Sequence, residues 1–261
     1  MITLVVEPPR FAAGDGDERG LPAAGRPGHA PAQPHLLLTV EGDAYRHLFR
    51  ARRIGVGERL RVVDGEGRAR WGEVIQVGRT AALVELAEPA APNEPQLHLE
   101  VLVATLRPEP ASWLVEKATE LGAAAIRFLN TERGPRSFGA GTADRLRRVA
   151  IAAVEQCHRA RCPEVTGPHP FADVTTLASA ADHRWLLDPA ATSQGFDSAT
   201  PISPSPMESL LVGPEGGWSP AERETLEAEG WQRISLGPRI LRIETAVLAA
   251  TALLLLRNGS S

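Results

Sequence analysis

The sequence predicts an α/β fold preceded by a small β-barrel, because the hydrophobic pattern changes once along the chain. Residues 36–86 consist of short β-type runs separated by turn residues. From residue 97 onward, strand-like runs alternate with helical patterns, which is typical of a mostly parallel sheet covered by helices. Near its end the chain has two Gly-Pro turns, at Gly213 and Gly237, and each of them follows a strand-like run.

The first part contains a hairpin signal and two segments without regular structure. Residues 64–67 read Asp-Gly-Glu-Gly, which is typical of a tight turn between antiparallel strands. Residues 11–34 have no hydrophobic period, so we expect a flexible insertion. Residues 87–95, with three prolines, predict a linker. The expected strands are residues 36–40, 59–63, 71–77 and 82–86.

The second part is expected to hold the parallel sheet. Gly122 closes a helix predicted over residues 113–121, because glycine favours the left-handed conformation that ends helices. A helix over residues 142–158 places apolar side chains on one face, and a closing helix begins near Glu244. Residues 189–208 predict a long surface loop. The expected strands are residues 98–104, 125–129, 184–187 and 209–212.

The composition is typical of a globular protein with an arginine-rich surface. The net charge is -4, and 27 of the 28 basic residues are arginine. The net charge argues weakly against a nucleic-acid partner, but residues 46–53 carry four arginines and no acid, and arginine suits phosphate groups. The alternative is a solvated surface with a bias toward arginine. No run approaches the ~20 apolar residues of a membrane span, and the first residues resemble no signal peptide. We therefore expect a cytoplasmic protein with no membrane contact.

The two cysteines, Cys157 and Cys162, flank His158. Zinc usually takes four ligands, and no second pair of ligands lies nearby in the sequence. We therefore expect buried thiols, no disulfide and no metal.

Two segments carry the candidate chemistry, and both lead from a strand through a Gly-Pro turn into a helix. In residues 212–223 the glycines permit close approach of a ligand to the backbone, and Ser219 and Glu222 have capping-box spacing. In residues 235–246, two arginines make an anion site at a helix start. Ligands bind at the carboxyl ends of strands in such sheets. For each segment the alternative is a strand-to-helix connection without a ligand.

The motifs of these segments resemble those of the RsmE family, the 16S ribosomal RNA uracil-N3 methyltransferases of the SPOUT class. The resemblance covers almost the whole chain except residues 11–34 and 189–208. It rests on GPEGG at 213–217, LGPRILRIETA at 236–246, WLVEKATELG at 113–122, TER at 131–133, EQCHRARCP at 155–163, and on residues 47–58 and 64–67.

The resemblance implies a PUA-like, RNA-binding β-barrel over residues 1–90 and a SPOUT α/β domain with a deep trefoil knot over residues 96–261. It also implies that the cofactor is S-adenosylmethionine, cradled by both Gly-Pro turns, and that the protein is a homodimer acting on 16S ribosomal RNA or the 30S subunit. The residues expected to bind the cofactor are Leu187, Val212, Gly213, Pro214, Glu215, Gly216, Gly217, Leu236, Gly237, Ile240 and Leu241.

The expected catalytic residues are Arg242, Arg239 and Glu244. The arginines would stabilise the uracil anion that forms as N3 loses its proton, while Glu244 or Glu215 orients an arginine or accepts the proton. The residues expected to bind RNA are Arg46, Arg50, Arg52, Arg53, Arg133, Arg159 and Arg161.

Two other functions remain open at this point. One is a related SPOUT enzyme that methylates a ribose 2′-hydroxyl, which would match the barrel motifs poorly. The other is a non-enzymatic ribosome-assembly factor that binds RNA through the barrel. The intact pair of Gly-Pro turns argues against the second alternative.

Overall fold

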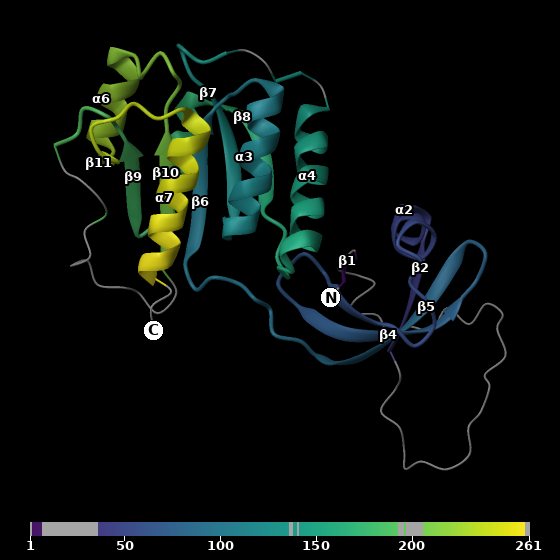
Figure 1. Ribbon diagram of the computed structural model, residues 1–261. Coiled ribbons are helices and arrows are strands. Elements are labelled where there is room, and N and C mark those ends of the chain that lie inside the picture. Colours follow the sequence, from purple (N-terminus) through teal and green to yellow (C-terminus); the bar gives the residue numbers. More distant parts are fainter. Residues whose placement is uncertain are drawn as a thin grey trace. The chain divides into compact units, whose positions relative to one another are not determined.

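The computed structural model describes residues 2–6, 36–135, 138–139, 141–192, 196 and 206–258. The predicted insertion at residues 11–34 and most of the predicted loop at residues 189–208 lie outside the described residues. The chain divides into two compact units, and their elements are shown in Figure 1. The first unit consists of residues 1–93 and His158–Arg161, and the second of residues 94–157 and 162–261.

The first unit is built on a five-stranded mixed sheet with the strand order β1-β3-β4-β5-β2. All four strands predicted here are confirmed, whereas β1, which pairs parallel with β3, was not expected. Strand β5 runs into the predicted linker and ends at Pro89, where it pairs only with β4, and proline is tolerated on such an edge. The strands are β1 (Thr3–Val5), β2 (Leu36–Glu41), β3 (Arg59–Val63), β4 (Ala69–Val77) and β5 (Ala81–Pro89).

The predicted hairpin at residues 64–67 is confirmed, because β3 and β4 pair antiparallel across it. Asp64 is buried and accepts hydrogen bonds from the backbone N–H groups of Glu66 (2.9 Å) and Arg68 (3.0 Å). Burial raises the pKa of Asp64, but these bonds and the Arg68 guanidinium outweigh it, so its pKa lies below the ordinary value. The ionised carboxylate thus organises the turn.

The segment His158–Arg161 belongs to the first unit, although the sequence places it after the helix of the second. The carbonyl oxygen of His158 accepts a hydrogen bond from Nη1 of Arg61 at 2.5 Å, and its Nδ1 lies 2.7 Å from Oγ1 of Thr3. Arg159 is only 3% exposed. The segment therefore packs against strands β1 and β3 of this unit.

The second unit contains a six-stranded parallel sheet with the strand order β11-β9-β10-β6-β7-β8. The four strands predicted here are confirmed, and β8 and β11 are additional. The sequence therefore predicted the parallel α/β class correctly. The strands are β6 (His98–Ala104), β7 (Ala125–Asn130), β8 (Glu164–Pro170), β9 (His183–Leu187), β10 (Met207–Val212) and β11 (Gln232–Ile234).

Helices cover both faces of this sheet. In Figure 1, α3, α4 and α7 lie side by side on one face, over a core that includes Leu99, Val101 and Val103. Helices α5 and α6 contribute Val174 and Leu226 to the core on the opposite face. The helices are α3 (Pro108–Leu121), α4 (Thr142–Cys157), α5 (Val174–Leu177), α6 (Pro220–Ala228) and α7 (Ile243–Asn258).

The helix boundaries follow local rules. Gly122 ends α3 with φ of 115°, as predicted. Helix α3 begins at Pro108, five residues before the predicted start, because proline is tolerated in the first turn, where the N–H needs no helical partner. Within the described residues, no helix has the length and apolarity that crossing a bilayer would require.

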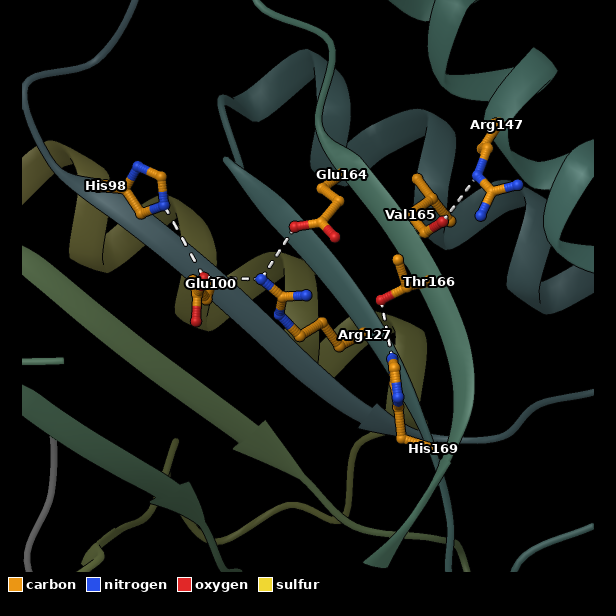
Figure 2. Close-up of polar contacts among 8 residues, drawn as sticks. All are labelled: His98, Glu100, Arg127, Arg147, Glu164, Val165, Thr166 and His169. Carbon is orange, nitrogen blue, oxygen red and sulfur yellow. Dashed lines mark hydrogen bonds and ion pairs between the residues drawn. The ribbon is translucent and has the colours of Figure 1, made fainter. Parts of the chain in front are cut away.

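Polar side chains also tie neighbouring strands of this sheet together. Figure 2 shows Arg127 of β7 between two carboxylates, Glu100 of β6 and Glu164 of β8, at 3.1 and 3.0 Å. Residues 98–100 begin β6 and Glu164 begins β8, so this network lies toward the amino ends of the strands. Because Arg127 is largely buried, the ion pairs help to hold β6, β7 and β8 in register.

A second buried ion pair anchors the last helix. Glu208 of β10 is 2% exposed, pairs with Arg257 near the end of α7, and accepts a hydrogen bond from the indole N–H of Trp185 at 2.7 Å. The Arg257 guanidinium also lies 5.6 Å from the centroid of the Trp185 ring, which is within cation–π range. Glu208 thus connects α7 to β9 and β10.

We expect Glu208→Gln to lower the unfolding free energy of the second unit by about 3–5 kcal/mol, because it leaves a largely buried arginine without its carboxylate. Chemical denaturation would measure the loss. Asp144→Asn is the control, since the Asp144–Arg147 pair is mostly exposed and exposed pairs contribute little. Equal losses in the two variants would contradict the assignment.

Candidate active site

A cavity of about 390 Å³ lies at the carboxyl ends of β9, β10 and β11. The segments that follow these three strands form its walls, together with the start of α7. It brings together twelve of the residues predicted for cofactor binding or catalysis: Leu187, Val212, Gly213, Pro214, Glu215, Gly217, Leu236, Gly237, Arg239, Ile240, Leu241 and Arg242. Two other predicted residues, Gly216 and Glu244, are outside its lining.

The first turn, residues 213–218, is closed by a buried tryptophan. A Cβ atom on Gly213 would lie 2.7 Å from the Trp218 ring, so glycine is what allows Trp218 to pack under the turn. Gly217 has a φ of 68° and donates its N–H to the carbonyl oxygen of Pro214 at 2.8 Å. Helix α6 then begins with the predicted capping box of Ser219 and Glu222.

The second turn, residues 235–241, is shaped by a serine and a glycine. The hydroxyl oxygen of Ser235 accepts the N–H of Gly237 at 3.3 Å and lies 3.2 Å from its carbonyl oxygen. Gly237 has a φ of 102°, which other residues rarely adopt. Beyond it, Arg239 and Arg242 are exposed at the cavity, and neither guanidinium group makes a hydrogen bond or ion pair with another described residue. Their guanidinium groups are thus available to a ligand.

A buried carboxylate that the sequence did not point to also lines the cavity. Asp188, 6% exposed, follows β9 and accepts hydrogen bonds from Nη1 of Arg223 at 3.0 Å and Nε of Arg233 at 2.9 Å. Its other oxygen accepts the N–H of Ala190 at 2.9 Å. Burial raises the pKa of Asp188, but that N–H and the two guanidinium groups outweigh it, so its pKa lies below the ordinary value.

The loop after β7 is attached to the first turn through Glu222. The Glu222 carboxylate accepts the N–H of Glu132 at 2.8 Å and the N–H of Ser219 at 2.9 Å. Nη1 of Arg133 donates to the carbonyl oxygen of Gly216 at 3.2 Å, and a Cβ on Gly216 would lie 3.1 Å from the Cβ of Arg133. Gly216 thus leaves room for the loop that carries Arg133, and its predicted contact with the cofactor stays a prediction.

The sequence prediction missed eight cavity-lining residues: Asp188, Pro189, Trp218, Arg223, Ile234, Ser235, Ile243 and Ala246. Asp188 had one usable signal, its place directly after a predicted strand, where ligands bind in parallel sheets. Its partners stand 35 and 45 residues away in the sequence, and no local pattern joins them.

The arginines predicted to contact RNA have different surroundings in the first unit. Arg46, Arg50, Arg52 and Arg53 lie exposed on or just after α2 (Gly42–Tyr45) and the π-helical turn η1 (Arg46–Ala51). Arg46 pairs with Asp43, so the acid-free run has an acidic neighbour. Buried Arg159 offers little surface to RNA, whereas Arg161 is exposed.

Metal ligands do not gather in the part of the chain that the structure describes. There, no three His, Cys, Asp or Glu side chains lie together as a metal site would need. Cys157 and Cys162 are half-buried, whereas the sequence predicted buried thiols.

Comparison with known proteins defines the class to which this fold and site belong. Residues 92–255 match the model of an RNA methyltransferase domain, and residues 40–87 match that of an RNA methyltransferase PUA domain. These ranges confirm the predicted order, a PUA domain followed by a methyltransferase domain.

The chain is also similar to named proteins over most of its length. It is 32% identical to the ribosomal RNA small subunit methyltransferase E of Mycobacterium tuberculosis, with 82% of this chain and 84% of that protein covered. The Bacillus subtilis protein of the same name is 28% identical, with 82% and 87% covered. A crystal structure of the Neisseria gonorrhoeae protein of that name, bound to S-adenosylmethionine, matches with a TM-score of 0.72 at 25% identity, covering 84% of this chain and 90% of that one. The chain therefore belongs to the ribosomal RNA small subunit methyltransferase E family, as its motifs indicated.

Proposed function

We propose that this chain methylates N3 of a uridine in 16S ribosomal RNA, with S-adenosylmethionine as methyl donor. The observation that carries the proposal is the single cavity in which both Gly-Pro turns meet and which Arg239 and Arg242 border. Membership of the family and the printed names of the relatives support ribosomal RNA as the substrate. The deep knot implied by the resemblance stays a prediction.

The cavity fits S-adenosylmethionine in size and in lining. About 390 Å³ lies within the range of roughly 300–1,000 Å³ of small-molecule sites. Leu187, Val212 and Leu241 offer apolar walls to an adenine ring, while the glycine turns bring backbone N–H and C=O groups to the cavity. The Neisseria relative binds the same molecule. When bound here, S-adenosylmethionine would supply an electrophilic methyl group.

The chain's own residues would prepare the uracil for attack. The N3 proton is weakly acidic, and its loss leaves negative charge on the base, which Arg242 and Arg239 would stabilise from the cavity wall. Glu215 lines the cavity and Glu244 does not, so Glu215 is the better placed carboxylate to orient an arginine or accept the proton. The target base has to leave its stack to reach such a cavity.

The exposed arginines of the first unit would hold the RNA backbone. The guanidinium groups of Arg52 and Arg53 make no hydrogen bond or ion pair with another described residue, and Arg50 donates one guanidinium N–H to the carbonyl oxygen of Arg79. In the second unit, Arg133 lies against the first turn of the cavity and would contact the RNA near the target base. Phosphate contacts of this kind fix the register of a nucleic acid without reading its sequence.

We further propose that the protein is a homodimer that works in the cytoplasm, where ribosomal subunits are built. The dimer is supported by large apolar side chains that are exposed on α7 and on the second turn. Leu253 and Leu256 are 49% and 70% exposed, and Ile240 is 89% exposed. Leu253 and Leu256 are three residues apart on one helix and share a face. Such side chains are the ones that a second copy of the chain would cover.

Ribosomal RNA from a strain that lacks the gene should lose one N3-methyluridine, and expression of this chain should restore it. Nucleoside mass spectrometry of the small-subunit RNA would detect the change. Expression of the Arg242→Ala variant is the control. Loss of a 2′-O-methylated nucleoside, or no loss at all, would refute the proposed reaction.

Arg242→Ala should lower single-turnover methylation by about 100-fold, the scale of removing one preorganised charge-stabilising group. Affinity for S-adenosylmethionine should change little, and Arg242→Lys should rescue only in part because it lacks the planar fork. Arg148→Ala removes an exposed arginine from α4, away from the cavity lining, and should leave the rate unchanged. A variant Arg242→Ala that melts earlier but keeps its rate would show a structural role instead.

Replacing Arg46, Arg50, Arg52 and Arg53 with Gln should weaken RNA binding and flatten its dependence on salt. Each lost phosphate contact should reduce the slope of log K against log [salt] by roughly 0.7–0.9. Two double variants give a matched comparison. One replaces Arg52 and Arg53 with Gln, and the control replaces Arg59 and Arg70 with Gln. Arg59 suits the control because it is already paired with Glu88 on the sheet. Equal slopes for the two double variants would show that RNA binds elsewhere.

A further inference from the structure

The Asp188 carboxylate contacts one residue that follows the first glycine turn and one residue that precedes the second. Arg223, one of its partners, lies in α6, the helix that follows the first turn, and Arg233 lies in β11, the strand that leads into the second. Asp188 itself begins the connection that follows β9 and lines the cavity. One carboxylate thus joins the three segments that form the cavity walls.

The hydrogen bonds at Asp188 require a side chain with two acceptor oxygens. Oδ1 accepts the N–H of Ala190, and Oδ2 accepts from both arginines. An asparagine has one acceptor oxygen, and its NH₂ group only donates. It can satisfy the backbone N–H or the guanidinium groups, but not both, and it carries no charge to hold two cations together.

We propose that Asp188 is a positioning residue, which fixes the two glycine turns relative to each other and so sets the affinity of the cavity for S-adenosylmethionine. This inference rests on the proposed function. Asp188 acts here through Arg223 and Arg233 and not by chemistry on the substrate. Its two ion pairs are only partly exposed: the side chains of Arg223 and Arg233 are 39% and 33% exposed and that of Asp188 is 7%.

Arg233 gives the sharpest test because it does not line the cavity. A substitution there can lower ligand affinity only through the placement of its neighbours. Arg223 lines the cavity, so its loss would mix positioning with direct contact. Glu208 supplies the control, because it is another buried acid bound to an arginine, near the start of β10 and outside the cavity lining.

The experiment measures the Kd of the full-length chain for S-adenosylmethionine by calorimetry, at a temperature well below the melting point of every variant. We expect at least tenfold weaker binding for Asp188→Asn and at least threefold for Arg233→Gln. Glu208→Gln should bind as tightly as the unaltered chain, although it is less stable. If Asp188→Asn fails to fold, Arg233→Gln carries the test.

A second measurement needs no ligand. Backbone hydrogen exchange in residues 213–217 and 235–241 should be faster in Asp188→Asn and Arg233→Gln than in the unaltered chain, and unchanged in Glu208→Gln. If the Asp188→Asn and Arg233→Gln variants fold and keep the Kd and the exchange rates of the unaltered chain, this inference is overturned but the proposed function is not. Failure of the unaltered chain to bind S-adenosylmethionine would overturn the proposed function and the inference together.

Discussion

The candidate site depends on one constraint, which is that β9, β10 and β11 run parallel and end at the same edge of the sheet. Leu187 pairs in register with Val212 on one side and with Ile234 on the other. The three connections that follow these strands therefore leave from one edge and enclose a single cavity. A shift of one residue in the pairing of one of these strands would turn its side chains to the opposite face of the sheet and would separate Asp188 from its arginines.

Within this frame the glycines have different tasks. Gly213 makes room for the Trp218 ring, and Gly216 makes room for Arg133, while Gly237 supplies a left-handed backbone at the second turn. Gly213 and Gly216 thus each let a side chain of the protein pack closely against the first turn. Trp218 in turn packs 5.7 Å from the Phe171 ring, so the first turn is fixed to the core beneath it. A ligand would then meet a preformed surface, which lowers the entropic cost of binding.

The sequence predicted the parts of the fold that depend on local rules, as the hairpin at Asp64, the capping box at Ser219 and the helix end at Gly122 show. It did not predict β1 or β11, which have only three residues each and are too short to show a periodic pattern. It also missed β8, whose seven residues include one glycine and two prolines, residue types that are depleted in strands. The Gly-Pro turns indicated the site because their residue types are unusual. The ion pairs of Asp188 could not be predicted, because their partners are brought together only by the order of strands in the sheet.

The net charge of the chain, -4, would oppose RNA binding only if all charges counted equally. Several acids are buried and already bound by arginines or backbone N–H groups, among them Asp64, Asp188, Glu208 and Glu222. Their fields are largely cancelled by these partners at the distance from which RNA approaches, where screening also acts. The arginines whose guanidinium groups have no partner among the described residues include Arg239 and Arg242 at the cavity and Arg52 and Arg53 on the first unit. Since steering of a charged partner depends on the exposed charges and their location, the proposed RNA contacts depend on these positions and not on the sum of charges over the chain.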